Sequence, residues 1–179
     1  MKINFTLFGS GLTGGNFNIM EPAQRLALRG HEVSITSIGS PRDLNWFRGN
    51  KPLFKETFTP LSGKLHYRIY RKILNGTMLH PFPWVEIRDL VRSMPDCDVN
   101  IATAAPTSWA VHRSGKGKGF YYIQHYDSFF VENQLVNKIH DESYYLPLKK
   151  LTVSSWLKNI VEDKLEVKVS NVINAGIEE

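Results

Sequence analysis

The sequence has little cysteine and no long hydrophobic run. Its 179 residues include one cysteine, Cys97, which excludes an internal disulfide and a zinc site made of several thiolates. No apolar stretch approaches the roughly 20 residues that cross a bilayer, and the apolar run at the N-terminus is too short for a signal peptide. We therefore expect a cytoplasmic protein.

Acidic residues are the minority among the charged ones. The chain has 22 Lys and Arg against 17 Asp and Glu, a formal net charge of +5. A basic balance suits phosphate-bearing ligands, nucleic acid or an anionic membrane surface. Hydrophobic residues make up 42% of the 179 positions, and domains typically run about 100 to 150 residues. We expect one domain over residues 1–179.

Strand and helix patterns alternate along the chain. Apolar and β-branched runs predict strands at 3–8 and 31–38, and one apolar face predicts a helix at 19–29 between them. Further strands are expected near 53–58, 98–104, 119–124, 148–153 and 171–173, and further helices near 85–93, from Pro106, at 142–146 and at 155–164. Such alternation predicts a doubly wound, mostly parallel, Rossmann-like α/β sheet.

Residues 59–84 interrupt this alternation with a basic, aromatic segment bounded by prolines. Within it, residues 64–74 place apolar side chains on one helical face and basic ones on the rest. Two interpretations stay open, namely a peripheral membrane contact through 64–84 and an ordinary helix with a solvated basic face.

Residues 7–18, LFGSGLTGGNFN, form a glycine-rich loop after the first strand. Gly9, Gly11 and Gly14 fit the dinucleotide pattern G-x-G-x-x-G, which needs a helix starting within it and an acidic residue at the end of the second strand. The second strand ends in TSIG without an acid, and Pro22 would lie inside such a helix. We therefore expect a longer open loop, with the helix beginning later, whose amides face a ligand.

Four segments carry a family resemblance. They are Gly14-Gly15 with AQRLALRGHEV (23–33), DCDVNIATAAPTSWA (96–110), FYYIQHYDSFF (120–130) and LTVSSWLKNIVEDKLEVKVSNVINAGIEE (151–179). Their order and spacing resemble the N-terminal half of GT-B glycosyltransferases, of the glycosyltransferase family 4 (group 1) type and its rhamnosyltransferase-like branch.

The resemblance implies the acceptor-binding domain of a retaining hexosyl- or rhamnosyltransferase. Such an enzyme uses a nucleotide sugar as co-substrate, without a further cofactor, to build a cell-surface glycan or polysaccharide on a glycan or lipid-linked acceptor. It also implies a second, donor-binding domain, which this chain does not contain, so transfer by this chain alone should be negligible.

The resemblance further implies a set of site residues. The amides of Gly14, Gly15 and Asn16 would face the donor diphosphate or the acceptor. His125 and Asp127 would be catalytic. Tyr126 and Thr103 complete the predicted binding residues.

Each of these roles has a plainer alternative. His125 would otherwise be a surface histidine, and Asp127 would be either a base or the cap of the following segment. Thr103, with the neighbouring Thr107, would cap the next helix. Ser154 is best read as an N-cap.

Other functions stay open. The remaining histidines show no ligand spacing, so we expect no bound metal. An NAD(P)-binding protein would use Arg42 to bind a 2′-phosphate. A nucleic-acid-binding module would use the basic, aromatic segment 59–84, although no known RNA- or DNA-binding motif is present.

Overall fold

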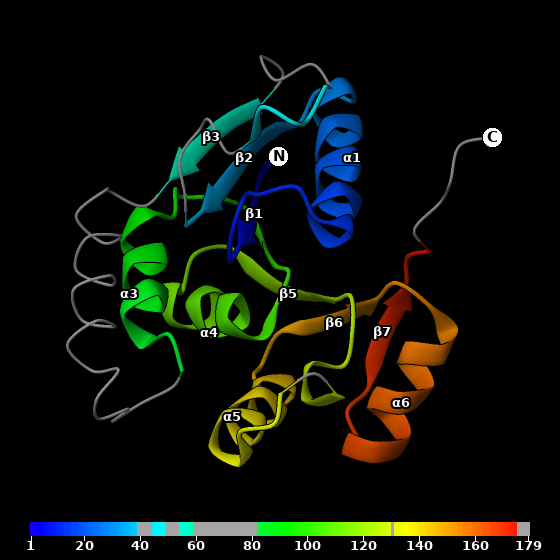
Figure 1. Cartoon of the computed structure of the whole chain (residues 1–179). Coiled ribbons are helices and arrows are strands. Elements are labelled where there is room, and N and C mark those ends of the chain that lie inside the picture. The colour runs from blue at the N-terminus through cyan, green and yellow to red at the C-terminus, as the bar shows by residue number, and fades with distance from the viewer. Residues whose placement is uncertain (39–43, 49–53, 59–81, 130, 175–179) are drawn as a thin grey trace.

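A computed structural model describes residues 1–38, 44–48, 54–58, 82–129 and 131–174. Its centre is one parallel sheet of seven strands in the order β3-β2-β1-β4-β5-β6-β7 (Figure 1). The strands are β1 (Lys2–Leu7), β2 (Glu32–Ser37), β3 (Phe54–Phe58), β4 (Val99–Ala102), β5 (Lys118–Ile123), β6 (Lys149–Thr152) and β7 (Val169–Val172). The predicted doubly wound, Rossmann-like α/β fold is confirmed.

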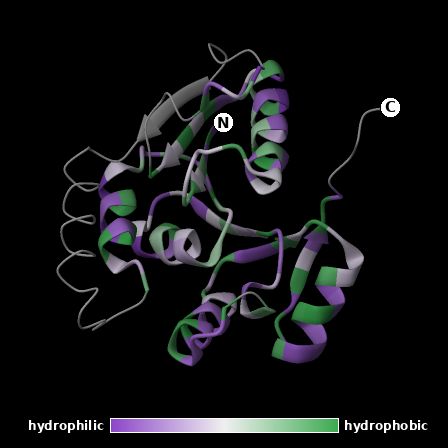
Figure 2. Cartoon of the chain, viewed as in Figure 1, coloured by the Kyte–Doolittle hydropathy of each residue, from purple (hydrophilic) through white to green (hydrophobic). Residues whose placement is uncertain are grey.

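Helices cover both faces of this sheet. They are α1 (Gly14–Leu28), α3 (Trp84–Ser93), α4 (Ala105–Ser114), α5 (Gln134–Tyr144) and α6 (Ser155–Leu165). Helix α1 packs on Ile3, Phe5 and Leu7 of β1, whereas α3 to α6 share a separate core with β4 to β7. Figure 2 shows the visible helices with both hydrophobic and hydrophilic residues, as expected of helices half buried against a sheet. The strand order reverses between β1 and β4. Sheets of this kind bind ligands outside the carboxyl ends of the strands at such a point.

Helix α1 begins earlier than the sequence indicated. It starts at Gly14, the third glycine of the G-x-G-x-x-G pattern, and contains Pro22. The prediction of a long open loop before this helix is therefore wrong. Thr13 caps the helix by accepting a hydrogen bond from the Asn16 amide at 3.1 Å, and Pro22 leaves the carbonyl of Asn18 without its usual amide partner. The helix tolerates one missing bond because Ile19, Met20, Ala23 and Ala27 bury its inner face.

The other elements agree with their predicted positions, with one shift. Helix α5 begins at Gln134, capped by Asn133, rather than near residue 142. Ser154 is confirmed as an N-cap, since its hydroxyl accepts from the Leu157 amide at 3.2 Å. Residues 59–81 of the basic, aromatic segment, and Arg42, lie outside the described residues, so the predictions that rest on them stay predictions. Within the described part of the chain, no helix has the length and apolar character needed to cross a membrane.

The sheet face opposite α1 carries a buried polar ladder across β2, β1 and β4. The Asn4 amide donates to Thr6 Oγ1 at 3.1 Å and to Asn100 Oδ1 at 3.0 Å. Asn4 Oδ1 accepts from Ser34 at 3.0 Å and from Thr36 at 2.9 Å. All five side chains are buried, so each bond replaces water that the groups lost on folding. The ladder joins β1, from which the glycine-rich loop continues, to its neighbours β2 and β4.

Candidate functional site

Three predicted site segments meet at the carboxyl edge of the sheet. The glycine-rich loop follows β1, Thr103 follows β4, and residues 124–127 follow β5. A Cβ built at Gly15 would lie 3.3 Å from Gln124 Oε1, and Gln124 Nε2 donates to the Thr103 carbonyl at 3.4 Å. The side chain of Gln124 therefore bridges all three segments.

The glycines of this loop are not explained by backbone strain. The described glycines with positive φ are Gly30, Gly115 and Gly117, all outside the loop. A Cβ at Gly9, Gly11 or Gly14 would meet nothing within 4 Å. Neither a special turn nor a close packing contact requires glycine there, which leaves open space beside the loop.

The Asn16 side chain is used within the loop. Its Nδ2 donates to the carbonyls of Gly9 at 2.8 Å and Gly11 at 2.7 Å. Its backbone amide donates to the hydroxyl oxygen of Thr13, the N-cap of α1. The amides of Gly14 and Gly15 have no recorded acceptor in the described structure, as expected for the first turn of a helix. Asn16 therefore bonds within the loop, and a ligand contact of the Gly14, Gly15 and Asn16 amides stays a prediction.

The hydroxyls after β4 bond to the backbone. Thr103 is buried, and its hydroxyl donates to the Thr6 carbonyl at 2.9 Å. Thr107 Oγ1 accepts from the amides of Thr103 and Ala104, each at 2.9 Å, and donates to the Ala104 carbonyl. Thr107 is therefore a capping residue. For Thr103 the binding role stays a prediction, with only the oxygen lone pairs left for a ligand.

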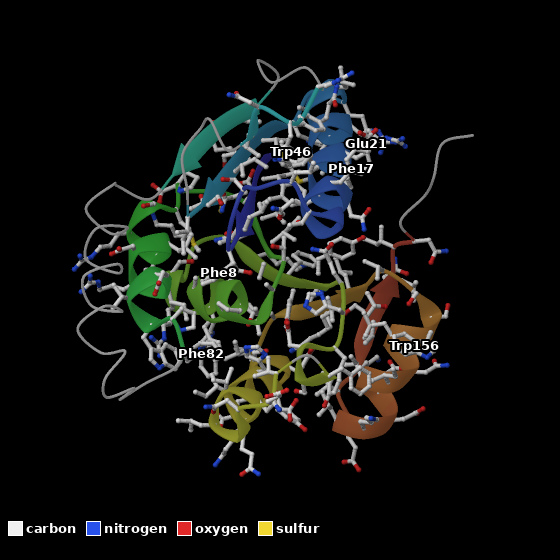
Figure 3. The ribbon with its side chains drawn as sticks, in the orientation of Figure 1. Phe8, Phe17, Glu21, Trp46, Phe82 and Trp156 are labelled. Atoms are coloured by element: carbon white, nitrogen blue, oxygen red, sulfur yellow. The ribbon has the colours of Figure 1, made fainter. Side chains whose placement is uncertain are left out.

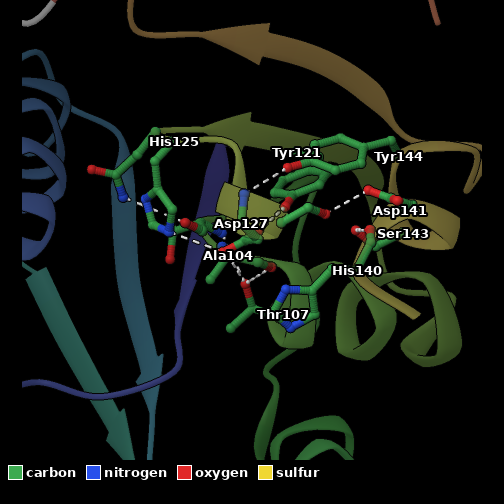
Figure 4. A network of polar contacts seen from close by, with 12 residues as sticks. Ala104, Thr107, Tyr121, His125, Asp127, His140, Asp141, Ser143 and Tyr144 are labelled. Carbon is green, nitrogen blue, oxygen red and sulfur yellow. Dashed lines mark hydrogen bonds and ion pairs between the residues drawn. The ribbon is translucent and has the colours of Figure 1, made fainter. Parts of the chain in front are cut away.

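His125 and Asp127 form an ion pair after β5, with His125 Nε2 and Asp127 Oδ1 2.9 Å apart (Figure 4). The His125 side chain is 51% exposed and the Asp127 side chain only 11%. Asp127 Oδ2 accepts from the buried Tyr121 hydroxyl at 3.3 Å, and its amide donates to Tyr144 Oη at 3.3 Å. Both carboxylate oxygens of Asp127 are thus engaged, and His125 is the member of the pair that reaches the surface.

Burial and the Asp127 charge act on the surrounding titratable groups. The hydrogen bond to Asp127 raises the pKa of His125, partly opposed by burial. Burial, and then the charge of Asp127, raise the pKa of Tyr121 and of Tyr144. Burial lowers the pKa of His140, which packs edge-on against Phe82. The tyrosines stay protonated hydroxyls at neutral pH, and Tyr121 can donate to Asp127.

Tyr126 is buried beside this pair. Its hydroxyl donates to Asp141 at 3.1 Å, and its ring packs on Phe129 and Tyr144. Lys164 lies 5.7 Å from the ring centroid. Through these contacts Tyr126 stabilises the loop after β5. Its predicted contact with a ligand stays a prediction.

Replacing Asp127 with Asn is expected to lower the pKa of His125 below its ordinary 6.5, because burial persists while the carboxylate partner is lost. In the unchanged protein the pKa lies above 6.5. The pair therefore adds stability fully present below pH 6.5, which is lost as the pH rises through the folded-state pKa. NMR titration of the His125 ring protons measures both values. Equal pKa values in the two proteins would contradict the pairing.

Other features lie away from this edge. A hollow of about 550 Å³ at the opposite end of the strands is lined by Met1, Lys2, Gly30, Glu32, Asp96, Cys97 and Asp98, and it includes none of the predicted site residues. Among the residues that the structure describes, no group of three His, Cys, Asp or Glu is placed to hold a metal ion.

Two residues of the site were missed as site residues by the sequence analysis. Gln124 was visible in the quoted FYYIQHYD segment, one position before His125. Trp46, after β2, donates its indole N–H to the Ser10 carbonyl at 2.8 Å (Figure 3). No spacing rule connects Trp46 with a loop 36 residues earlier.

Comparison with known proteins gives little further evidence. No family model matches the sequence, and neither does any curated protein. A solved structure described as lipopolysaccharide outer core galactosyltransferase WaaB, apo form, is similar at a TM-score of 0.48 and 16% identity, over 96% of this chain and 44% of that one. Arabidopsis thaliana UGT89C1 complexed with UDP-L-rhamnose is similar at a TM-score of 0.46 and 13% identity, over 98% of this chain and 48% of that one.

The chain thus spans less than half the length of either structure. TM-scores below 0.5 at such identities carry no argument about substrates or site residues.

Proposed function

We propose that this chain is the acceptor-side domain of a retaining, nucleotide-sugar-dependent glycosyltransferase of the GT-B architecture. The observation that carries the proposal is that a Cβ added at Gly15 would lie 3.3 Å from Gln124 Oε1. The glycine-rich loop thus lies beside the segment that holds His125 and Asp127. Three of the four segments that resemble this family, those with Gly14-Gly15, Thr103 and residues 124–127, lie together there. The proposed product is a cell-surface glycan or polysaccharide, made at the cytoplasmic face of a membrane.

The glycine-rich loop suits a diphosphate. Helix α1 has 15 residues, and the positive end of its dipole and the amides of Gly14 and Gly15 favour an anion. Open space beside Gly9, Gly11 and Gly14 would let phosphate oxygens approach the backbone. In the proposed reaction these donors stabilise the negative charge that builds up on the departing diphosphate.

His125 is the proposed contact with the reacting sugars. Its Nε2 is bonded to Asp127, which fixes the orientation of the ring. Asp127 itself is mostly buried and already accepts from His125 and Tyr121, so we assign it to orienting His125 rather than to deprotonating the acceptor. In a retaining reaction of the kind proposed, the leaving phosphate takes the acceptor proton.

Apolar side chains near the glycine-rich loop are exposed, as expected if another domain or a ligand packs over them. Phe8 is 37% exposed, Leu12 71% and Phe17 52%; Figure 3 labels Phe8 and Phe17. The proposed donor-binding domain and the acceptor would cover this edge. A lipid-linked acceptor agrees with the basic charge of the chain, although the segment 64–84 lies mostly outside the described residues.

A second candidate, an NAD(P)-binding protein, gains support from two observations. Helix α1 begins inside the G-x-G-x-x-G pattern. The first six strands of the seven-stranded sheet follow the order 3-2-1-4-5-6, which is typical of dinucleotide-binding sheets. Against it, β2 ends at Ser37 and the next described residue is Ile38, so no acidic side chain there is available for a ribose hydroxyl.

Calorimetric titration of the chain with uridine diphosphate and with NADPH separates the two candidates. The glycosyltransferase proposal predicts weak binding of uridine diphosphate and no tight binding of NADPH. Tight NADPH binding that is lost in Arg42→Ala would overturn it. Steeply salt-dependent binding of oligonucleotides would instead favour the nucleic-acid alternative.

A further inference from the structure

Three consecutive carbonyls of the glycine-rich loop are held by side chains. Asn16 Nδ2 holds those of Gly9 and Gly11 at 2.8 and 2.7 Å, and Trp46 Nε1 holds that of Ser10 at 2.8 Å. Asn16 comes from the first turn of α1, and Trp46 comes from the segment after β2. Two side chains from different parts of the chain thus converge on one stretch of backbone.

This arrangement decides which backbone groups stay available. Among the described residues every peptide bond is trans, and a trans peptide points its N–H opposite to its C=O. The amides of Ser10, Gly11 and Leu12 therefore face away from the side chains that hold the neighbouring carbonyls. No acceptor for these three amides is recorded among the described residues. The carbonyl oxygens of residues 9–11 are hydrogen-bonded, and the N–H groups of residues 10–12 are left for a ligand.

A separate observation points to a missing partner in the same loop. The Ser10 side chain is only 2% exposed, yet its hydroxyl has no hydrogen-bond partner among the described residues. Gln124 Oε1, beside Gly15, is likewise buried without a donor there. Buried polar atoms normally have partners. Unpaired polar atoms on two segments of the same edge indicate that a polar ligand completes it.

We infer that Trp46 and Asn16 are positioning residues that hold the glycine-rich loop in its diphosphate-binding conformation. The inference rests on the proposed function. Both residues act through the backbone: they turn the carbonyls of residues 9–11 away from the anion and fix the amides of residues 10–12. Asn16 therefore contributes through its side chain to the loop, in place of the direct ligand contact expected from the sequence.

The test compares pyrophosphate affinity in the chain and three variants by ¹⁵N NMR titration. Trp46→Phe keeps a ring and removes one hydrogen bond, so pyrophosphate binding should weaken about three- to tenfold. Asn16→Ala removes two bonds and should weaken it by roughly tenfold or more. Trp109→Phe is the matched control, because Trp109 Nε1 also donates to a backbone carbonyl, that of Ile139 at 3.4 Å. It should bind pyrophosphate within about twofold of the unchanged chain.

NMR spectra of the variants without ligand distinguish a positioning role of Trp46 from a general loss of stability. Trp46→Phe should shift the amide signals of Ser10, Gly11 and Leu12, whereas Trp109→Phe should leave them in place even if both variants lose the same stability in urea. If the unchanged chain binds pyrophosphate and Trp46→Phe binds it equally well, the inference is wrong and the proposed function stands. If the unchanged chain does not bind pyrophosphate, the diphosphate site itself fails, and the inference fails with it.

Discussion

Asn4→Ala is expected to lower the free energy of unfolding by about 3–5 kcal/mol. The substitution removes four hydrogen bonds in the buried ladder. It leaves the hydroxyls of Ser34 and Thr36 without their acceptor, whereas Asn100 Oδ1 keeps its bond from the Thr6 hydroxyl. An unsatisfied buried group costs about 1–3 kcal/mol, more than a lost hydrogen bond at the surface. Urea unfolding followed by circular dichroism measures the change.

Two further variants keep this prediction testable. Ser34→Ala removes one donor from the same ladder and should cost about 1 kcal/mol, so it reports on the ladder even if Asn4→Ala fails to fold. Asn171→Ala is the control, because Asn171 is exposed and its side chain, within the described part of the chain, accepts only from the adjacent Val172 amide. This substitution should change stability by less than about 0.5 kcal/mol. A loss below about 1 kcal/mol for Asn4→Ala would show that the ladder does not stabilise the sheet.

Gly15→Val is expected to weaken uridine diphosphate binding by roughly tenfold or more, which corresponds to about 1.4 kcal/mol. Its Cβ would lie 3.3 Å from Gln124 Oε1, and its methyl groups would displace Gln124 or extend into the ligand space. Valine is a slightly better helix former than glycine, and Gly15 has no positive φ that glycine alone would favour. Stability should therefore change by less than about 1 kcal/mol while binding falls.

Gln24→Val is the matched control for this substitution. It places the same branched side chain later in α1, away from the glycine-rich loop, and should leave binding within about twofold. Calorimetry gives the affinities, and urea unfolding gives the stabilities. If Gly15→Val binds uridine diphosphate as well as the unchanged chain does, no ligand approaches the first turn of α1.

The sheet could be predicted from the sequence because strand patterns alternate with helical ones, and parallel strands with crossover helices allow few arrangements. The start of α1 could not be predicted, since Pro22 is a helix breaker in isolation and only the packing of residues such as Ile19 and Met20 shows that it is tolerated. The polar ladder was missed because Asn4 and Asn100 lie nearly a hundred residues apart, and a single sequence does not show which strands are neighbours.

The candidate site was predicted in part. Gly14, Gly15, His125 and Asp127 were identified as candidates from the sequence, and the structure places them on segments that Gln124 joins. The sequence did not show which of these residues would contact a ligand and which would support their neighbours. The burial of Asp127 and the use of Asn16 within the loop depend on neighbours that only the fold brings together.

The central claim is that the edge formed by the glycine-rich loop and residues 124–127 binds the diphosphate of a nucleotide sugar. The most direct test is a ¹⁵N NMR titration of this chain with uridine diphosphate, read residue by residue. The account predicts that the largest changes occur at the amides of residues 10–16 and 124–127. Changes confined to the opposite end of the strands, around Gly30 and Asp98, would contradict it.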